Sequence, residues 1–451
     1  MKRILVALAC VLGLLAASPF VPRTPAQTDV DRALEEEIFK IRAIDHHAHP
    51  MRATREGEQD REFDALVPDV LEPSPLPVRL RPENIEFVGA WRDLWGYTHD
   101  DMTEAHLREL VEAKRRATRE HGDAHPAWVL DKLNIEVMFA NRVAMGRGLT
   151  PERFRWVAFD DALMLPLDSA AVRKINPDYA AFYPGEDSLL KRYLSDLKMG
   201  AVPSTLREYT ARVVTPTLER QRRDGAVGVK FEAAYLRALD FDDADEANAA
   251  RIYARYARGG APAADEYKPL QDFLFRYVAR EAGRLGMAVH IHTGAGVGGY
   301  FGVAGASPLM LEPAFNDPSL RKTNFVMLHG GWPFADQTAA MLLKPNVYAD
   351  FSLQTLLRTP RALAQTLRGW LETVPEKVMF GTDAFDETQE VGWEDVGWLS
   401  NRTGREALAI ALTGMMRDGE ITRERASELA RMVMHDNAAK LYGIKSLSQN
   451  H

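Results

Sequence analysis

Two histidines, His47 and His49, have the residue types and spacing that point most clearly to chemistry in this chain. They lie in the segment 45–50, DHHAHP. Side chains two positions apart on a strand point to the same face, so both imidazoles would face one way. By the same alternation, His46 would face the helix layer. Two adjacent imidazoles make half of a metal site, although a short His-x-His match is equally typical of hydrogen-bonded histidines in a turn.

Further polar residues stand at the ends of short apolar runs later in the chain. They are Lys230, His290 and His292, His329 and Asp383. Each has an ordinary alternative role, because a buried His can be hydrogen-bonded, Asp383 can cap a helix, and Lys230 can pair with Glu232. Charged residues are rarely buried without a partner, so several strand-end residues of this kind indicate one shared site. Imidazoles with a carboxylate and an open position describe a hydrolytic metal site.

The elements that would position these residues are eight short apolar strands separated by helical stretches. The predicted strands are 42–47, 136–141, 156–165, 226–231, 288–292, 324–329, 346–351 and 377–382. The predicted helices include 107–121, 188–197, 205–222, 270–285, 405–416 and 423–442. Eight alternating strand and helix units close into a barrel, whose active site lies at the carboxyl ends of the strands. We therefore predict an α/β fold, a single (β/α)8 TIM barrel with a long insertion after strand 1, at 50–130, and C-terminal helices.

The N-terminus has the pattern of a secretory signal peptide. Lys2 and Arg3 precede an apolar run, 4–17, which is too short to span a bilayer. Cleavage after Ala26 divides the chain into a signal peptide, 1–26, and a single catalytic domain, 27–451. The expected location is the periplasm or the cell exterior, with an uncleaved membrane anchor as the alternative.

Composition narrows the possible functions of the mature chain. Of its 451 residues, 46% are hydrophobic and 27% are charged, which is typical of a globular protein. Loss of Lys2, Arg3 and Arg23 leaves 53 basic against 64 acidic residues, a net charge of −11. Such a chain is a poor nucleic-acid binder, and after cleavage no apolar run is long enough for a membrane helix. Cys10 lies in the signal peptide, so disulfides are excluded and a metal site must use His, Asp, Glu or a modified Lys.

The strand-end motifs together resemble the amidohydrolase superfamily, in its amidohydrolase-related (amidohydrolase 2-like) branch. The resemblance runs through HAHP at 47–50, HTG at 292–294, HGG at 329–331, GTD at 381–383 and NAAKLY at 437–442. It covers nearly all of the mature chain. The branch includes relatives of uronate isomerase and a module fused to some proteins of the glutamine-synthetase type.

The resemblance implies a divalent metal, expected to be zinc, bound by His47, His49 and Asp383 with one or both of His292 and His329. Zinc lowers the pKa of a bound water from about 15.7 to about 7. Asp383 would accept that proton and return it to the leaving group, and His329 could instead polarise the scissile carbonyl. The sequence allows one or two ions. Lys230 would bridge two ions if carboxylated, or would contact the substrate as an ammonium.

The substrate is expected to be a small molecule. Tyr235 and Arg237 are candidate substrate-binding residues, although Leu236 separates them where the related module has the Arg directly after the Tyr. We expect an exported metal-dependent hydrolase that cleaves an amide, ester or lactone. The alternatives are a metal-dependent decarboxylase, a uronate-isomerase-like enzyme and a non-catalytic exported binding protein. The sequence leaves the oligomeric state open.

Overall fold

The computed structural model describes residues 30–55 and 57–445. The predicted signal peptide, 1–26, lies outside the described residues. Within those residues, no helix is both long enough and apolar enough to cross a membrane.

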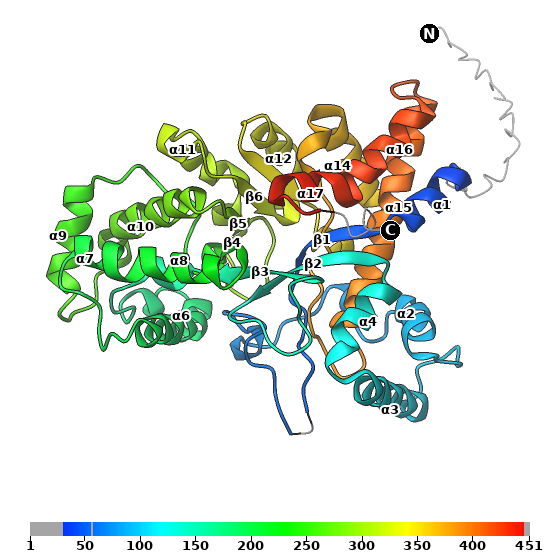
Figure 1. Ribbon diagram of the computed structural model, residues 1–451, viewed down its shortest axis with the longest axis horizontal. Coiled ribbons are helices and arrows are strands. Elements are labelled where there is room, and N and C mark those ends of the chain that lie inside the picture. The colour runs from blue at the N-terminus through cyan, green and yellow to red at the C-terminus, as the bar shows by residue number, and fades with distance from the viewer. Residues whose placement is uncertain (1–29, 56, 446–451) are drawn as a thin grey trace, which may run out of the picture.

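The eight strands form one parallel sheet whose order in space is their order in the chain. They are β1 (Ala43–Ala48), β2 (Ile135–Arg142), β3 (Phe154–Phe159), β4 (Ala226–Phe231), β5 (Ala288–His292), β6 (Phe325–Leu328), β7 (Val347–Asp350) and β8 (Val378–Met379). The residues after β8 return to β1 through hydrogen bonds from His46 N to Phe380 O at 2.9 Å, from Asp383 N to His47 O at 2.7 Å, and from His49 N to Ala384 O at 2.7 Å. The fold is therefore a nearly closed TIM barrel, as predicted (Figure 1).

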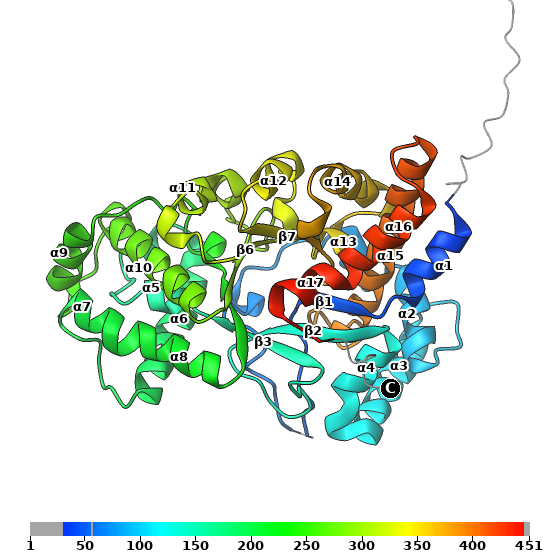
Figure 2. The same ribbon diagram turned by 45° about the horizontal axis from the view of Figure 1, so that its top comes forward.

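Helices cover the outside of the barrel, and Figures 1 and 2 show them ranged around the strands. They are α1 (Arg32–Lys40), α2 (Glu86–Trp95), α3 (Glu104–His121), α4 (His125–Lys132), α5 (Asp161–Met164), α6 (Pro177–Asp196), α7 (Leu206–Tyr209), α8 (Thr215–Arg223), α9 (Glu246–Tyr256), α10 (Ala264–Arg284), α11 (Glu312–Phe315), α12 (Ala335–Leu342), α13 (Gln354–Leu357), α14 (Pro360–Thr373), α15 (Trp393–Arg417), α16 (Arg423–Arg431) and α17 (Asn437–Tyr442). Each predicted helix falls on one or more of these segments and ends within a residue of the observed end, but α3, α6, α10 and α15 begin earlier than predicted. The insertion after β1 has no strand among its described residues and carries α2, α3 and α4.

All eight predicted strands are present, and the main error concerns the end of β3. The apolar run 156–165 predicted one strand, but β3 ends at Phe159 and the chain turns into α5. Asp160 N donates to Lys230 O at 3.0 Å, the last contact of this segment with β4. A continuous apolar run does not distinguish a buried strand from a buried helical turn, which explains the error.

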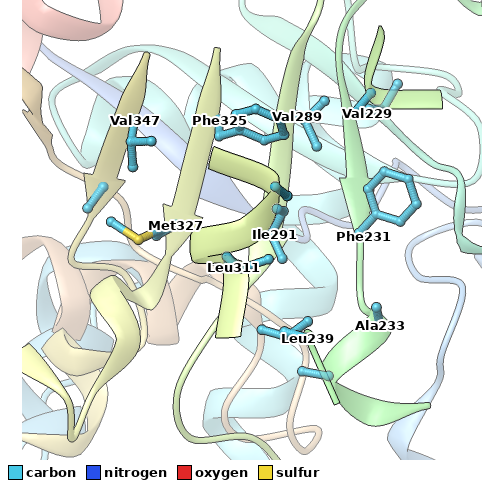
Figure 3. Close-up of a cluster of buried hydrophobic side chains, with 14 of the residues drawn as sticks. Val229, Phe231, Ala233, Leu239, Val289, Ile291, Leu311, Phe325, Met327 and Val347 are labelled. Carbon is cyan, nitrogen blue, oxygen red and sulfur yellow. The ribbon is translucent and has the colours of Figure 1, made fainter. Parts of the chain in front are cut away.

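Alternate strand residues divide between the helix layer and the barrel interior. Val229, Val289, Ile291, Phe325 and Met327 are fully buried in the large core between strands and helices (Figure 3). A second cluster fills the lower barrel and reaches Ala438 of α17; it consists of Ile44, Val137, Phe139, Val157, Val326, Leu328, Met379 and Ala438. Lys230 of β4 and His292 of β5 follow the inward alternation, which brings them to the barrel mouth. His329 comes directly after β6 and has the parity of the outward-facing Phe325 and Met327, so its inward direction depends on its left-handed backbone, with φ 63°.

His46 does not face the helix layer, contrary to the prediction. Its ring stacks on His290 at 4.6 Å and lies 5.2 Å from Phe139, so it is inside the barrel. Between Asp45 and Ala48, β1 advances three residues while β2 advances two. This extra residue is a β-bulge, which breaks strict alternation and lets neighbouring histidines both point inward at different levels.

Candidate metal centre

Three side chains from separate strand ends meet at the mouth of the barrel. One ligand atom from each of His47, His329 and Asp383 lies within 4.8 Å of the others. His47 Nε2 is 3.0 Å from Asp383 Oδ1, and His329 Nδ1 is 3.8 Å from Asp383 Oδ2. All three residues are buried, with at most 7% of any of them exposed. Three of the strand-end residues that were predicted to share one site therefore lie together in the structure.

His47 has the properties of a metal ligand in this arrangement. Although its Nε2 lies 3.0 Å from Asp383 Oδ1, neither of its ring nitrogens makes a hydrogen bond of acceptable geometry among the described residues. Burial, reinforced by the charge of Lys230, holds the pKa of His47 well below its usual range. A neutral, fully buried imidazole without a partner costs free energy unless something satisfies its lone pair. A divalent cation fits this need, since imidazole and carboxylate are ligands that zinc accepts.

The hydrogen bond between His292 and His329 leaves a lone pair on His329 Nδ1, which lies 2.9 Å from Ser352 Oγ and 3.8 Å from Asp383 Oδ2. Ala295 O accepts from His292 Nε2 at 3.0 Å, and His292 Nδ1 is 3.1 Å from His329 Nε2. Burial lowers the pKa of both histidines well below the usual range, so we assign neutral rings. His292 Nδ1 must then accept from His329 Nε2, which leaves the lone pair of His329 on Nδ1. His292 thus orients His329 through this hydrogen bond.

Two of the converging residues have left-handed backbone conformations. Asp383 has φ 56° and His329 has φ 63°. Such conformations cost non-glycine residues about 1–3 kcal/mol and are concentrated at functional sites. Burial raises the pKa of Asp383 to about 6, although the charges of His49 and Lys230 act in the opposite direction. This carboxyl group can therefore exchange a proton near neutral pH.

The glycines of the HTG and HGG motifs let the loop after β5 approach the loop after β6, and let the loop after β6 approach α14. Gly294 has φ +82°, and a Cβ there would collide with Trp332 O. Gly330 has φ +52°, and a Cβ there would collide with the ring of Trp370. The motifs thus need glycine for packing, while their histidines face the site.

His49 belongs to a second group of ligand atoms, with Asp64 and Glu232. Its Nδ1 is 2.9 Å from Asp64 Oδ2, and its Nε2 is 3.6 Å from Asp383 Oδ1. His47 and His49 do lie side by side, with ring centroids 5.1 Å apart. Sequence reasoning missed Asp64, which lies in the insertion where no periodicity marks it, and treated Glu232 only as a partner of Lys230.

Lys230 is buried close to this second group. Its Nζ is 3.8 Å from Glu232 Oε1 and makes no hydrogen bond within the described residues. The suggested pairing with Glu232 is therefore present as a long ion pair.

The two other candidate residues lie in different surroundings. The Tyr235 ring is 4.6 Å from the His292 ring, so Tyr235 borders the centre. Arg237 Nη2 instead pairs with Asp272 Oδ1 at 2.7 Å. Arg237 also lines a separate cavity of about 310 Å³, whose walls include none of the converging residues. The intervening Leu236, which is fully buried, accounts for this different direction.

Comparison with known proteins gives a family match over more than half of the chain. The family described as amidohydrolase matches residues 199–444. The protein fluG of Emericella nidulans is 27% identical over 230 residues, covering 48% of this chain and 25% of fluG. The chain thus spans about a quarter of the length of that relative.

Two solved structures share the fold over nearly their whole length. One, from Lactobacillus casei, is assigned as a metal-dependent hydrolase and has a TM-score of 0.61, 16% identity, and coverage of 91% of this chain and 97% of that one. The other, uronate isomerase from Thermotoga maritima, has a TM-score of 0.61, 14% identity and the same coverage. At these identities the likeness concerns the fold. The family match over residues 199–444, together with the barrel and its strand-end residues, shows that this chain belongs to the amidohydrolase family of the amidohydrolase superfamily.

Proposed function

We propose that this protein is a metal-dependent hydrolase whose divalent ion, expected to be zinc, is held by His47, His329 and Asp383. The observation that carries the proposal is the convergence of these three ligand atoms around a buried His47 with no hydrogen-bond partner in residues 30–55 and 57–445. Membership of the amidohydrolase family agrees with it. Carboxylation of Lys230 is not needed for this ion.

The ion would supply Lewis acidity and lower the pKa of a water molecule beside it. Asp383 then has the role of the proton-transferring group, because its buried carboxyl group lies among the ligands, beside the position of that water. His292 holds the ring of His329 through their 3.1 Å hydrogen bond. Tyr235, beside His292, is placed to contact a substrate.

The proposed substrate is a small molecule with an amide, ester or lactone bond. The N-terminal pattern at 1–26 supports a role outside the cytoplasm, in the periplasm or beyond the cell. The acidic balance of the mature chain disfavours nucleic acid as a partner.

The test measures metal content and turnover on a panel of amides, esters, lactones and carboxylates, in water labelled with ¹⁸O. The wild type should contain zinc and incorporate the label into its product. Asp383→Asn should lose at least ~100-fold in turnover, since general acid–base catalysis contributes about 10²- to 10⁴-fold.

Asp336→Asn is the control, because Asp336 is an exposed carboxylate in α12 that belongs to neither group of converging ligand atoms. It should behave as the wild type does. Undiminished turnover by metal-loaded Asp383→Asn would contradict the proposed role of Asp383. Release of carbon dioxide without incorporation of the label would show decarboxylation instead of hydrolysis.

A further inference from the structure

We propose that the cavity lined by Arg237 is a binding site for a second small molecule, an uncharged aromatic compound of two fused rings. The cavity has a volume of about 310 Å³. Its walls come from the segment that leads into α6, the loop after β4 and the start of α10. The site goes beyond the proposed function, because it holds neither the ion nor the substrate of the metal centre.

A single turn, at residues 233–236, separates the cavity from the metal centre. Tyr235 in this turn has its ring 4.6 Å from the ring of His292, whereas the next two residues, Leu236 and Arg237, line the cavity. Tyr183, on the cavity wall, donates to Leu236 O at 3.2 Å and so joins α6 to the turn. A molecule in the cavity would therefore touch the turn without touching the converging ligands.

The walls of the cavity are mainly aromatic and aliphatic. Tyr183 is 1% exposed and Leu236 is fully buried, so these walls are fixed by packing. The rings of Tyr179 and Tyr183 stand at 65° to each other, with centroids 6.0 Å apart. Two rings at this angle form a corner, and a third ring can pack there in the offset or edge-to-face arrangements that aromatic groups prefer.

The apolar surface continues to the rim of the cavity. Ile175 lines the cavity and is 60% exposed. A single exposed apolar residue is common, but this one extends a concave apolar surface into solvent, which is typical of small-molecule sites. The rim also carries Asp265, an exposed carboxylate that stays in contact with water.

The buried charges of the cavity are already paired with one another. Lys268 Nζ donates three hydrogen bonds, each of 2.7 Å, to Asp240 O, Asp242 Oδ2 and Asp272 Oδ2. An ammonium group has three donors, so this one has none left for a ligand. Arg237 Nη2 pairs with Asp272 Oδ1 at 2.7 Å and donates to Asp240 O at 3.2 Å. A charged ligand would lose water here without gaining a free partner, so the site favours an uncharged one.

The volume sets the size of this ligand. An apolar cavity of about 150 Å³ holds benzene. The cavity of about 310 Å³ is twice as large and accommodates two fused rings. Gln271, which is 4% exposed, adds a buried polar group to the walls. Small-molecule sites combine apolar walls with a few such groups, so a ring compound with one hydroxyl group fits the cavity.

The test measures binding of 2-naphthol to the full-length protein by calorimetry and ligand-observed NMR. The anion 2-naphthoate and the cation 2-naphthylmethylammonium are the charged comparisons. We expect 2-naphthol to bind at one site and each charged analogue to bind at least ~10-fold more weakly, because neither charge finds a free partner. Tighter binding of either charged analogue would overturn the proposal.

Variants of the cavity locate the bound probe. Ala264→Trp places a large ring in the cavity and should weaken 2-naphthol binding at least ~10-fold, since even one methylene group in an apolar pocket changes affinity by about that factor. Ala339→Trp is the matched control, because Ala339 is a half-buried alanine that lines a different cavity, beside α12; it should bind as the wild type does. Ile175→Ser changes an exposed residue, so the fold should persist, and binding should weaken about 3-fold through lost apolar contact.

Asp383→Asn separates this site from the metal centre. It should bind 2-naphthol as the wild type does, because Asp383 is not in the cavity wall. If Asp383→Asn loses the probe while Ala264→Trp and Ile175→Ser keep it, the probe lies in the metal centre and the second site is wrong. A wild type that binds none of the three compounds also overturns the second site, and leaves the proposed function to its own test of metal content and turnover.

Discussion

The left-handed conformations of Asp383 and His329 are held by specific contacts. Asp383 N donates to His47 O at 2.7 Å, so one ligand fixes the backbone of another. His329 N donates to Asp350 Oδ1 at 2.9 Å, and the same oxygen accepts from Ser352 Oγ. These bonds offset the cost of about 1–3 kcal/mol for each strained residue. The position of His329 therefore depends on Asp350, and the position of Asp383 depends on His47.

A buried carboxyl group outside the ligand set, Asp160, is expected to make stability depend on pH. Burial raises the pKa of Asp160 to about 8, whereas the ordinary value is 3.8. Between these values the folded protein binds the proton and the unfolded chain does not, so stability falls as pH rises. Each pH unit costs up to about 1.4 kcal/mol. Asp160→Asn should therefore be more stable than the wild type by at least ~2 kcal/mol at pH 7.5 and nearly equal to it at pH 4.

Urea unfolding at the two pH values measures this difference. The asparagine keeps the oxygen that accepts from Gln221 at 2.9 Å, so the hydrogen bond should remain. Asp243→Asn is the control, because Asp243 is exposed, and it should show no such dependence. A constant difference between Asp160→Asn and the wild type at both pH values would rule out the titration of Asp160 as the cause.

At the scale of elements, α17 closes the lower end of the barrel through one hydroxyl group. Tyr442 Oη lies 2.7 Å from His46 Nε2 and 2.6 Å from His290 Nε2. A hydroxyl donates one hydrogen bond and accepts others, so it serves one ring as donor and the other as acceptor. His46 Nδ1 continues the chain to Asp350 at 3.0 Å. A buried polar network thus connects α17 to the carboxylate that holds His329.

Tyr442→Phe should destabilise the protein by about 1–3 kcal/mol, because it leaves buried ring nitrogens without a partner. Thermal and urea unfolding measure the loss. The same variant should weaken zinc binding less than Asp383→Asn does, since Tyr442 acts only through Asp350. Tyr300→Phe is the matched control, with 48% of Tyr300 exposed, and should change stability by less than ~0.5 kcal/mol. Equal stability of Tyr442→Phe and the wild type would show that the network does not stabilise the fold.

The elements also show which features sequence patterns can predict. β4 and β5 were predicted with their observed bounds, because each is a short, mainly apolar run with a polar residue at its last or next-to-last position. The inward positions of Lys230 and His292 followed from alternation. The inward direction of His46 could not be predicted from alternation, because the local sequence does not reveal the bulge in β1. Asp64 was missed for a related reason: the insertion that carries it has no periodicity, and its place beside His49 depends on tertiary packing.

At the scale of the whole molecule, the strand order brings distant parts of the chain to one centre. β1 lies between β2 and the residues after β8, so His47 and Asp383 are neighbours although 336 positions separate them. The family match begins at residue 199 and therefore excludes β1 with both of its candidate ligands. The barrel nevertheless completes the site, because His47, His329 and Asp383 converge across that boundary. Segments on both sides of that boundary are thus needed to form the centre.

Zinc should stabilise the whole protein, because its ligands come together only in the folded barrel. A ligand present at 100 times its Kd adds about 2.7 kcal/mol to the free energy of unfolding. Protons compete with zinc for Asp383, whose pKa is about 6, so the stabilisation should be larger at pH 7.5 than at pH 5. Unfolding by urea, with zinc and with a chelator at each pH, measures it. Asp383→Asn should lose most of the effect, and Asp336→Asn should keep it. If zinc stabilised Asp383→Asn as much as the wild type, Asp383 would not be a zinc ligand, and zinc would bind elsewhere in the protein.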